Sequence, residues 1–341
     1  MDENINNIKL DLKDIKNKLL IGLDIGGTLT KICILCDKTE SSINFNDFII
    51  SKNIFEKIDL NSYYLFLSFF KTDKFETDFF KFLKDLNNIV KINELYLTGG
   101  GAYKFNDIIK KNFNIELLNH DELQSLKYGY LFMNNYNSFY EIENNSIKNV
   151  PPENLKFPHI SANIGSGVSI LKISSPEKYE RVGGTLMGGG SLIGLSKLII
   201  GIDNYEKILE LAEKGNNENI DITKKDFLKE NEDLKTENDI ISSLGKIHQY
   251  ILDGKKNEIK KEDIALSLLN MICYHITQYT VLYAKKNDID TIYYFGTFTK
   301  NNSLVNKILN KASKHWNKDI KVRFNNYSGF LGAIGTLLVK K

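Results

Sequence analysis

The chain has 341 residues, of which 42% are apolar and 26% are charged. This length exceeds the size at which one hydrophobic core usually stops growing, so we expect two lobes with a cleft between them. Forty-five basic and 43 acidic side chains leave a formal charge of +2. Such a balance provides no large single-sign field to attract nucleic acid or a membrane surface.

No apolar run reaches the roughly eighteen residues that a membrane span requires, and the first twenty residues are rich in charge. We therefore expect no membrane span, no secretory signal and a cytoplasmic location. The three cysteines, Cys33, Cys36 and Cys273, form no metal-ligand spacing. Because Cys33 and Cys36 fall on one predicted strand, alternation places them on opposite faces, and we interpret all three as reduced packing residues.

The segment Ile21 to Lys31, IGLDIGGTLTK, organises the first half of the chain. An apolar strand ends near Asp24, Gly26-Gly27 allows backbone to approach a ligand closely, and Thr28 and Lys31 add a hydroxyl and a cation. A hairpin into a second strand would aim backbone N–H groups at phosphate oxygens. An ordinary Gly-Gly hairpin without a ligand is the alternative.

Residues 1–18 are assigned no function, as a short helix or a loose terminus. The loop TGGGAYKF at Thr98 places three glycines between a strand and a helix, where a helix N-terminus can meet an anion. Periodicity predicts strands over 42–50, 64–69, 94–97 and 115–118 and helices over 77–86, 105–113 and 121–133.

Glu122 stands at the start of the last of these helices, after an N-cap-like Asp121. A carboxylate there is favoured by the helix dipole and needs no further function. Catalysis is the alternative, since acids with perturbed pKa values gather at active sites.

The second half of the chain repeats the layout of the first. Residues 135–158 are polar, contain Pro151-Pro152, and are interpreted as an insert or linker. HISANIGSGVSIL, from His159, is again a strand, a glycine turn and a strand. This repetition resembles the two-lobed α/β fold of actin, hexokinase and the heat-shock ATPases, a ribonuclease H-like fold with duplicated mixed sheets flanked by helices. The expected lobes are 19–134 and 159–341.

A loop rich in glycine, ERVGGTLMGGGSLIGL, begins at Glu180 and must bend close to another group. Arg181 offers it a fork-shaped donor for an acid or a phosphate. Beyond it, the patterns predict a charged loop over 231–239, a strand over 291–295, and helices over 191–200, 206–228 with a polar break at 215–219, 240–251, 261–286, 303–316 and 327–339.

Taken together, the motifs resemble the type II, or eukaryotic-type, pantothenate kinases over nearly all of 22–337. The matching stretches are GLDIGGTLTK at Gly22, TGGGAYKF at Thr98, DEL at Asp121, NIGSGVSI at Asn163, YERVGGTLMGGGSLIGL at Tyr179, NYEKILELAEKG at Asn204, KEDIALSLLNMI at Lys261 and GFLGAIGTLL at Gly329. The resemblance implies phosphorylation of pantothenate on its primary hydroxyl by ATP with magnesium. This is the first step of coenzyme A synthesis. It also implies inhibition by CoA or acyl-CoA and a homodimer.

The resemblance further implies roles for single residues. Glu122 matches the family's catalytic glutamate, a general base, and Lys31 matches its phosphate-contacting lysine. Arg181 matches an arginine near the substrate hydroxyl and the transferred phosphoryl group. In the first hairpin, Gly26, Gly27 and Thr28 would wrap phosphates, and Asp24 would meet magnesium through water. In the second hairpin, Ser166 and Gly167 would face nucleotide phosphates or substrate, and Ser169 would bind pantothenate. The adenine and ribose would be bordered by Gly188, Gly189, Gly190 and Gly296.

Trp316 falls where the family has a tryptophan that a neighbouring subunit contributes to the substrate site; a core anchor is the other interpretation. Three stretches depart from the family pattern: 275–280 (HITQYT), 297–300 (TFTK) and 325–326 (Asn-Asn). Two alternative functions remain. One is a weakly catalytic or non-catalytic subunit that regulates a second kinase chain, and the other is a sugar or N-acetylglucosamine kinase of the same superfamily.

Overall fold

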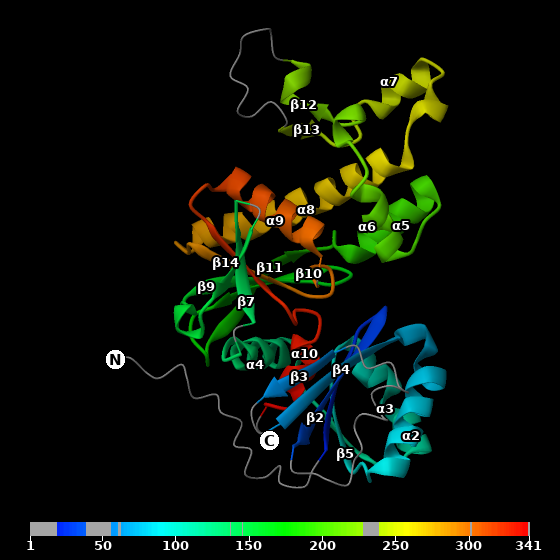
Figure 1. The fold of residues 1–341 in the computed structure, drawn as a ribbon, viewed down its shortest axis with the longest axis vertical. Helices are drawn as coiled ribbons and strands as arrows, with labels where there is room; N and C mark the ends of the chain where they lie inside the picture. The colour runs from blue at the N-terminus through cyan, green and yellow to red at the C-terminus, as the bar shows by residue number, and fades with distance from the viewer. Residues whose placement is uncertain are drawn as a thin grey trace.

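The computed structural model describes residues 19–38, 56–60, 63–136, 138–144, 146–227, 239–300 and 302–339. Residues 1–18, the strand predicted over 42–50 and most of the charged loop predicted over 231–239 lie outside these ranges. Two mixed sheets form the body of the molecule (Figure 1).

The first sheet has the strand order β3-β4-β2-β1-β5-β6. β1 pairs antiparallel with β2 and parallel with β5, which pairs parallel with β6. The strands are β1 (Leu20–Ile25), β2 (Leu29–Asp37), β3 (Glu56–Leu60), β4 (Tyr63–Lys71), β5 (Glu94–Thr98) and β6 (Glu116–Asn119), and the helices of this lobe are α2 (Phe80–Ile89), α3 (Gly100–Asn112) and α4 (Glu122–Asn134).

The second sheet has the order β11-β10-β9-β14-β15-β7-β8. β9 pairs antiparallel with β10 and parallel with β14, which pairs parallel with β15, so the central pattern of the first sheet recurs. This recurrence confirms the predicted duplication. The strands are β7 (Phe139–Glu143), β8 (Ser146–Val150), β9 (His159–Ile164), β10 (Val168–Ile173), β11 (Tyr179–Thr185), β14 (Thr291–Phe295) and β15 (Lys321–Asn325).

Side-chain alternation divides each sheet between two cores. On β1, Ile21 and Leu23 pack with α2 and α3, whereas Leu20 faces the opposite core with α4 and α10 (Leu331–Thr336). The second sheet contributes Tyr293 and Phe295 to that same core. α4 and α10 are therefore a shared layer between the two sheets, as Figure 1 shows.

The outer face of the second sheet is covered by the remaining long helices. Apolar side chains of α5, α6, α8 and α9 join this sheet in the largest core of the molecule. The helices are α5 (Gly189–Ile200), α6 (Tyr205–Ala212), α8 (Lys261–Lys286) and α9 (Ser303–Trp316). None of the helices in the described ranges is both long enough and apolar enough to cross a membrane.

Several predicted elements differ in the structure. The range 135–158, predicted as an insert or linker, contains β7 and β8, which extend the second sheet beside β15. The stretch 240–251 is not one helix but β13 (Ile240–Ser242), paired with β12 (Ile222–Thr223), followed by α7 (Ile247–Leu252). The helix predicted over 206–228 ends as α6 at Ala212, before the predicted polar break. Tertiary pairing explains the first two differences, since polar edge strands have little apolar periodicity.

Two glycine-rich helix starts also lie earlier than periodicity predicts. α3 begins at Gly100 and α5 at Gly189, inside their glycine runs. All three cysteines are free and buried, and Cys33 and Cys36 belong to the two cores on opposite sides of the first sheet. Both predictions for the cysteines are confirmed.

Candidate active site

The first hairpin joins β1 to β2 through a tight turn at residues 26–28. Gly26 N–H donates to the Leu29 carbonyl at 3.1 Å, and Thr72, the first residue after β4, holds the turn with its hydroxyl donating to the Gly26 carbonyl at 2.8 Å. Gly27 and Thr28 are exposed, and a Cβ on Gly27 would meet no atom within 4 Å. The turn therefore presents open backbone at the end of the sheet, as the phosphate-cradle hypothesis requires.

Asp24 and Lys31 face each other across this hairpin. They are paired in the strand register, and Lys31 Nζ lies 3.4 Å from Asp24 Oδ2. A Cβ on Gly99, which has a φ of +86°, would lie 2.8 Å from Asp24 Oδ1, and one on Gly332 would lie 2.9 Å from Oδ2. Glycine at both positions leaves room for the Asp24 carboxylate, so the TGGG turn and α10 enclose it.

Glu122 is the first residue of α4. Its neighbour Asp121 is the N-cap and accepts the Gln124 N–H at 2.8 Å, which fixes the start of the helix at Glu122. Glu122 keeps an exposed side-chain surface. Partial desolvation by the surrounding protein, followed by the charges of Asp24 and Asp121, raises its pKa, and Lys31 opposes the shift. Asp24, Lys31 and Glu122 are thus one electrostatic cluster.

The second hairpin lies at the start of α5. Its turn closes with the Gly165 N–H on the Gly167 carbonyl at 2.9 Å. Gly189 N–H donates to the Gly165 carbonyl at 2.8 Å, and Gly190 N–H to the Ser166 carbonyl at 3.0 Å. The structure therefore brings the two predicted glycine motifs together. These two amides hold the hairpin and are not available to an anion.

Glycine is required where α5 begins and where β14 ends. A Cβ on Gly188 would lie 2.7 Å from the Ser166 carbonyl oxygen, and one on Gly296 would lie 2.2 Å from the Ile164 carbonyl oxygen. Gly296 also has a φ of +102°. Both glycines thus pack directly against the β9–β10 hairpin, Gly188 at its turn.

β11 carries Arg181 along the edge of the second sheet. Arg181 is exposed, and its guanidinium makes no hydrogen bond or ion pair with any residue that the structure describes. Two positions earlier on the same strand face, Tyr179 interacts with Asp121 by a side-chain hydrogen bond, which contributes to the raised pKa of Tyr179 after burial and the Asp121 charge. β11 therefore approaches the α4 terminus that carries Glu122. Ser169, half-buried on β10, lies opposite Gly184 of β11.

Trp316 lies apart from this cluster, at the end of α9. Its Nε1 donates to Thr277 Oγ1 at 3.2 Å. It lines a cavity of about 390 Å³ together with Met187 of the glycine loop and His275 of α8. His275 Nε2 lies 3.0 Å from Thr185 Oγ1, so one of the departures from the family pattern contacts the glycine loop.

Lys300 is a residue that sequence reasoning did not assign to the site. Its Nζ lies 4.3 Å from the Phe330 ring centroid and 5.0 Å from that of Phe69 on β4. Burial lowers its pKa to about 8, which Glu56 opposes and Lys31 reinforces. A cation from the second lobe thus lies near the hairpin lysine of the first. The sequence shows Lys300 within TFTK, but no local pattern predicts that this lysine lies near the first hairpin.

The family resemblance implies magnesium at this site, and the residues present fit an ion that is bound through water. Among the described residues, no three His, Cys, Asp or Glu side chains gather to hold a metal. Asp24 offers one carboxylate beside the open turn. Mg²⁺ usually keeps several waters and is held by one or two carboxylates together with phosphates, so a single carboxylate suits it.

Comparison with known proteins agrees with this geometry. The fold is shared by component A of the (R)-2-hydroxyglutaryl-CoA dehydratase of Acidaminococcus fermentans, with a TM-score of 0.52 and 12% sequence identity over 94% of this chain and 96% of that one. It is also shared by the activator of the 2-hydroxyisocaproyl-CoA dehydratase of Clostridium difficile with bound ADPNP, with a TM-score of 0.50 and 13% identity over 94% of this chain and 93% of that one. The chain therefore has the two-lobed fold of the actin-like ATPases.

Two closer relatives carry sequence similarity over most of their length. The pantothenate kinase of Schizosaccharomyces pombe is 32% identical over 93% of this chain and 81% of its own, and pantothenate kinase 1 of Arabidopsis thaliana is 32% identical over 92% and 84%. A 4'-phosphopantetheine phosphatase of Mus musculus is 28% identical over 96% of this chain but 41% of its own length. The Fumble family model matches residues 20–339. The chain belongs to the Fumble family, that of the type II pantothenate kinases.

Proposed function

We propose that the chain is an ATP-dependent pantothenate kinase, which forms 4'-phosphopantothenate from the primary hydroxyl of pantothenate. One observation carries the proposal: Glu122, with a raised pKa, is coupled electrostatically to Asp24 and Lys31 beside the open Gly26-Gly27 turn. A base with a raised pKa is suited to accept a hydroxyl proton near neutral pH. The pantothenate kinase relatives supply the substrate.

Glu122 accepts the hydroxyl proton while the substrate oxygen forms its bond to the γ-phosphorus. The bond from the γ-phosphorus to the bridging oxygen breaks, and ADP leaves with that electron pair. Lys31 holds the charge on the transferred group, and the backbone N–H groups of Gly27 and Thr28 hold the phosphates. Because these donors are placed before the reaction, they stabilise the developing charge without rearranging.

The second lobe completes the site from across the cleft. Arg181 binds the substrate hydroxyl and the phosphoryl group with its planar guanidinium, and Ser169 positions the pantothenate. Ser166 and Gly167 face the nucleotide phosphates. The glycines at 188–190 and 296 shape the adenine and ribose site by letting backbone pack closely. Asp24 would hold magnesium through water, and the ion would supply charge neutralisation for the phosphates.

We further propose that the active form is a homodimer in which Trp316 of one copy borders the pantothenate site of the other. CoA or acyl-CoA would compete for the nucleotide site. These assignments rest on the family resemblance. The Trp316 cavity beside the glycine loop supports them, since it could receive the pantothenate arm of an inhibitor.

The decisive experiment is an assay of the purified chain with radiolabelled pantothenate, ATP and MgCl₂. We expect 4'-phosphopantothenate from this chain alone. Activity that appears only on addition of a second kinase chain would instead identify a regulatory subunit. Preferential turnover of glucose or N-acetylglucosamine in a substrate panel would identify a sugar kinase. ATP-independent phosphate release from 4'-phosphopantetheine, without kinase activity, would also contradict the proposal.

A further inference from the structure

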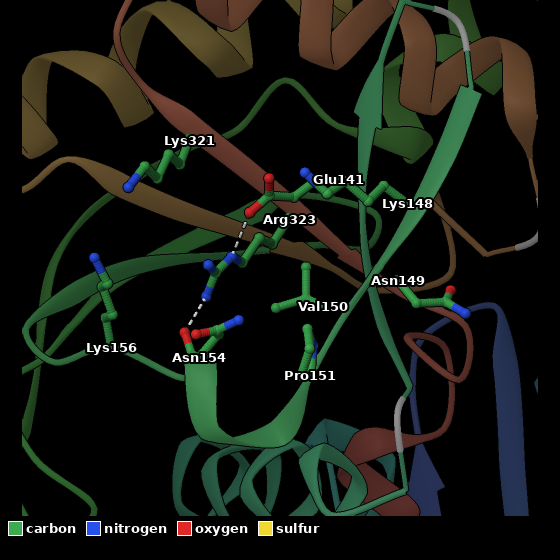
Figure 2. A pocket seen from close by; sticks show the side chains of 9 residues that line it. All are labelled: Glu141, Lys148, Asn149, Val150, Pro151, Asn154, Lys156, Lys321 and Arg323. Carbon is green, nitrogen blue, oxygen red and sulfur yellow. Dashed lines mark hydrogen bonds and ion pairs between the residues drawn. The ribbon is translucent and has the colours of Figure 1, made fainter.

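A second cavity, of about 230 Å³, opens at the far edge of the second sheet (Figure 2). It lies between β7, β8, β15 and the turn over 152–156, and its lining includes none of the residues proposed for catalysis or nucleotide binding. Four of its nine lining residues are basic, and only Glu141 is acidic: the basic ones are Lys148, Lys156, Lys321 and Arg323.

Arg323 forms the floor of this cavity in a fixed position. It is 5% exposed and lies opposite Glu141 in the β15–β7 register. Its Nε donates to Glu141 Oε1 at 2.8 Å, and its Nη1 donates at 2.6 Å to both the Asn154 carbonyl and the Tyr293 hydroxyl. The guanidinium is therefore ordered before any ligand arrives.

The remaining nitrogen of Arg323, Nη2, makes no hydrogen bond to any described residue. Figure 2 shows it on the side that faces Lys156, and the Lys321 amine reaches the same side. Lys321 Nζ lies 3.9 Å from Asp290 Oδ2, and the Asp290 side chain is 63% exposed. A hydrogen bond from Thr291, and then the charges of Lys321 and Lys156, lower the Asp290 pKa. Two lysines thus share one exposed carboxylate.

Lys148 differs from these two lysines. It pairs with the exposed Glu143 at 3.3 Å, and in Figure 2 its amine points toward Glu141. The positive end of the cavity is therefore defined by Lys156, Lys321 and Arg323.

We propose that this end of the cavity binds a phosphate group, through Arg323 Nη2 and the amines of Lys156 and Lys321, at a site separate from the catalytic cleft. A carboxylate is best recognised by two adjacent nitrogens of one guanidinium. Nε and Nη1 of Arg323 are already engaged, so no adjacent pair is free. A compact dianion with several oxygens instead suits one fixed donor and two ammonium charges.

The test is calorimetric titration of the full chain with inorganic phosphate at constant ionic strength, with a non-hydrolysable ATP analogue present to fill the cleft. We expect saturable binding that the double variant Lys156→Gln/Lys321→Gln weakens by at least about tenfold, since a hydrogen bond to a charged group contributes about 1.5 kcal/mol or more. Lys148→Gln is the matched control and should change the affinity less than about twofold, because an exposed, already paired lysine contributes little. Arg323 stays intact, because its removal would leave Glu141 without its buried partner.

Two further measurements make the result unambiguous. Acetate should not displace phosphate, and Lys31→Met should leave this binding unchanged. Loss of binding in Lys31→Met but not in the lysine pair would place the phosphate in the cleft and overturn the proposal, as would the absence of saturable binding. Thermal unfolding of each variant checks that it folds. This result is independent of kinase activity.

Discussion

Glu122 combines the two properties that a general base needs: a position at the start of a rigid helix and a pKa raised by its surroundings. We expect Glu122→Gln to lower kcat by about 10²- to 10⁴-fold, the usual contribution of a positioned base. ATP binding should persist, because glutamine keeps the shape of the side chain. Steady-state kinetics and nucleotide titration measure both.

The control for this variant is Glu116→Gln, an exposed acid on β6. It should retain full turnover. Wild-type kcat in Glu122→Gln would mean that another group accepts the proton.

The pH dependence follows from the same residue. A base must be deprotonated to act, so kcat/KM falls as pH drops through the Glu122 pKa, which burial and the Asp24 charge place above the ordinary value for glutamate. Asp121→Asn removes a charge that raises this pKa, so the acidic limb of the profile should move to lower pH. Asparagine remains a good N-cap, and the helix is preserved.

The matched control is Asp73→Asn, an exposed acid in the 3₁₀ turn after β4. Its acidic limb should coincide with that of the wild type. If the acidic limb did not move in Asp121→Asn, the Asp121 charge would not influence the pKa of the base.

At the residue scale, the sequence indicated those candidate site residues that stand in local motifs. Lys31 and Glu122 stand in recognisable motifs, and the structure couples them. Gly332 and Lys300 were missed as site residues, because their importance depends on contacts with Asp24 and with the first-lobe hairpin, far away in the chain.

At the scale of elements, the crossing of α4 and α10 decides how closely the two sheets approach. A Cβ on Gly335 would lie 1.6 Å from the Ser125 carbonyl oxygen, and one on Gly129 would lie 1.9 Å from that of Leu331. Because both obstacles are backbone atoms, neither helix can yield locally. We expect Gly335→Ala to destabilise the protein by about 1–3 kcal/mol, the typical cost of overpacking. Urea unfolding measures this change.

Gly194 provides the matched control, since it lies inside α5 and a Cβ there would meet nothing within 4 Å. Gly194→Ala should stabilise the protein by about 0.5–1 kcal/mol through helix propensity alone. Equal stability of the two alanine variants would show that the α4–α10 crossing tolerates a wider spacing.

At the scale of the whole molecule, an exposed apolar stripe is the natural surface for the proposed homodimer. Tyr279 and Leu282 of α8 are 39% and 55% exposed, and Leu186 of the adjacent glycine loop is 94% exposed. We expect a dimer by sedimentation velocity and a monomer for Leu282→Asp, because a charge there would be desolvated at the interface.

Leu252→Asp is the control, since Leu252 is 65% exposed on α7, outside this stripe. It should remain dimeric. A monomeric wild type would contradict the proposed homodimer. A dimeric Leu282→Asp would show that the interface lies elsewhere.

The sequence by itself determined the local features. Strand alternation predicted both hairpins and the opposite faces of Cys33 and Cys36, and the repeated glycine turns predicted the duplicated fold. These signals are short-range, because side-chain periodicity and the φ freedom of glycine act within a few residues. The family motifs are equally local, and they indicated Glu122 as the candidate general base.

Only the tertiary structure decided where distant segments meet. β7 and β8 joined the second sheet although their polar sequence indicated a linker, and α10 packed from the end of the chain against Asp24. Lys300 likewise came to lie near Lys31. Such contacts arise from packing between segments up to about 300 residues apart, and no local pattern encodes them. The two glycine hairpins were predicted from the sequence. The enclosure of Asp24 and the raised pKa of Glu122 result from the tertiary fold.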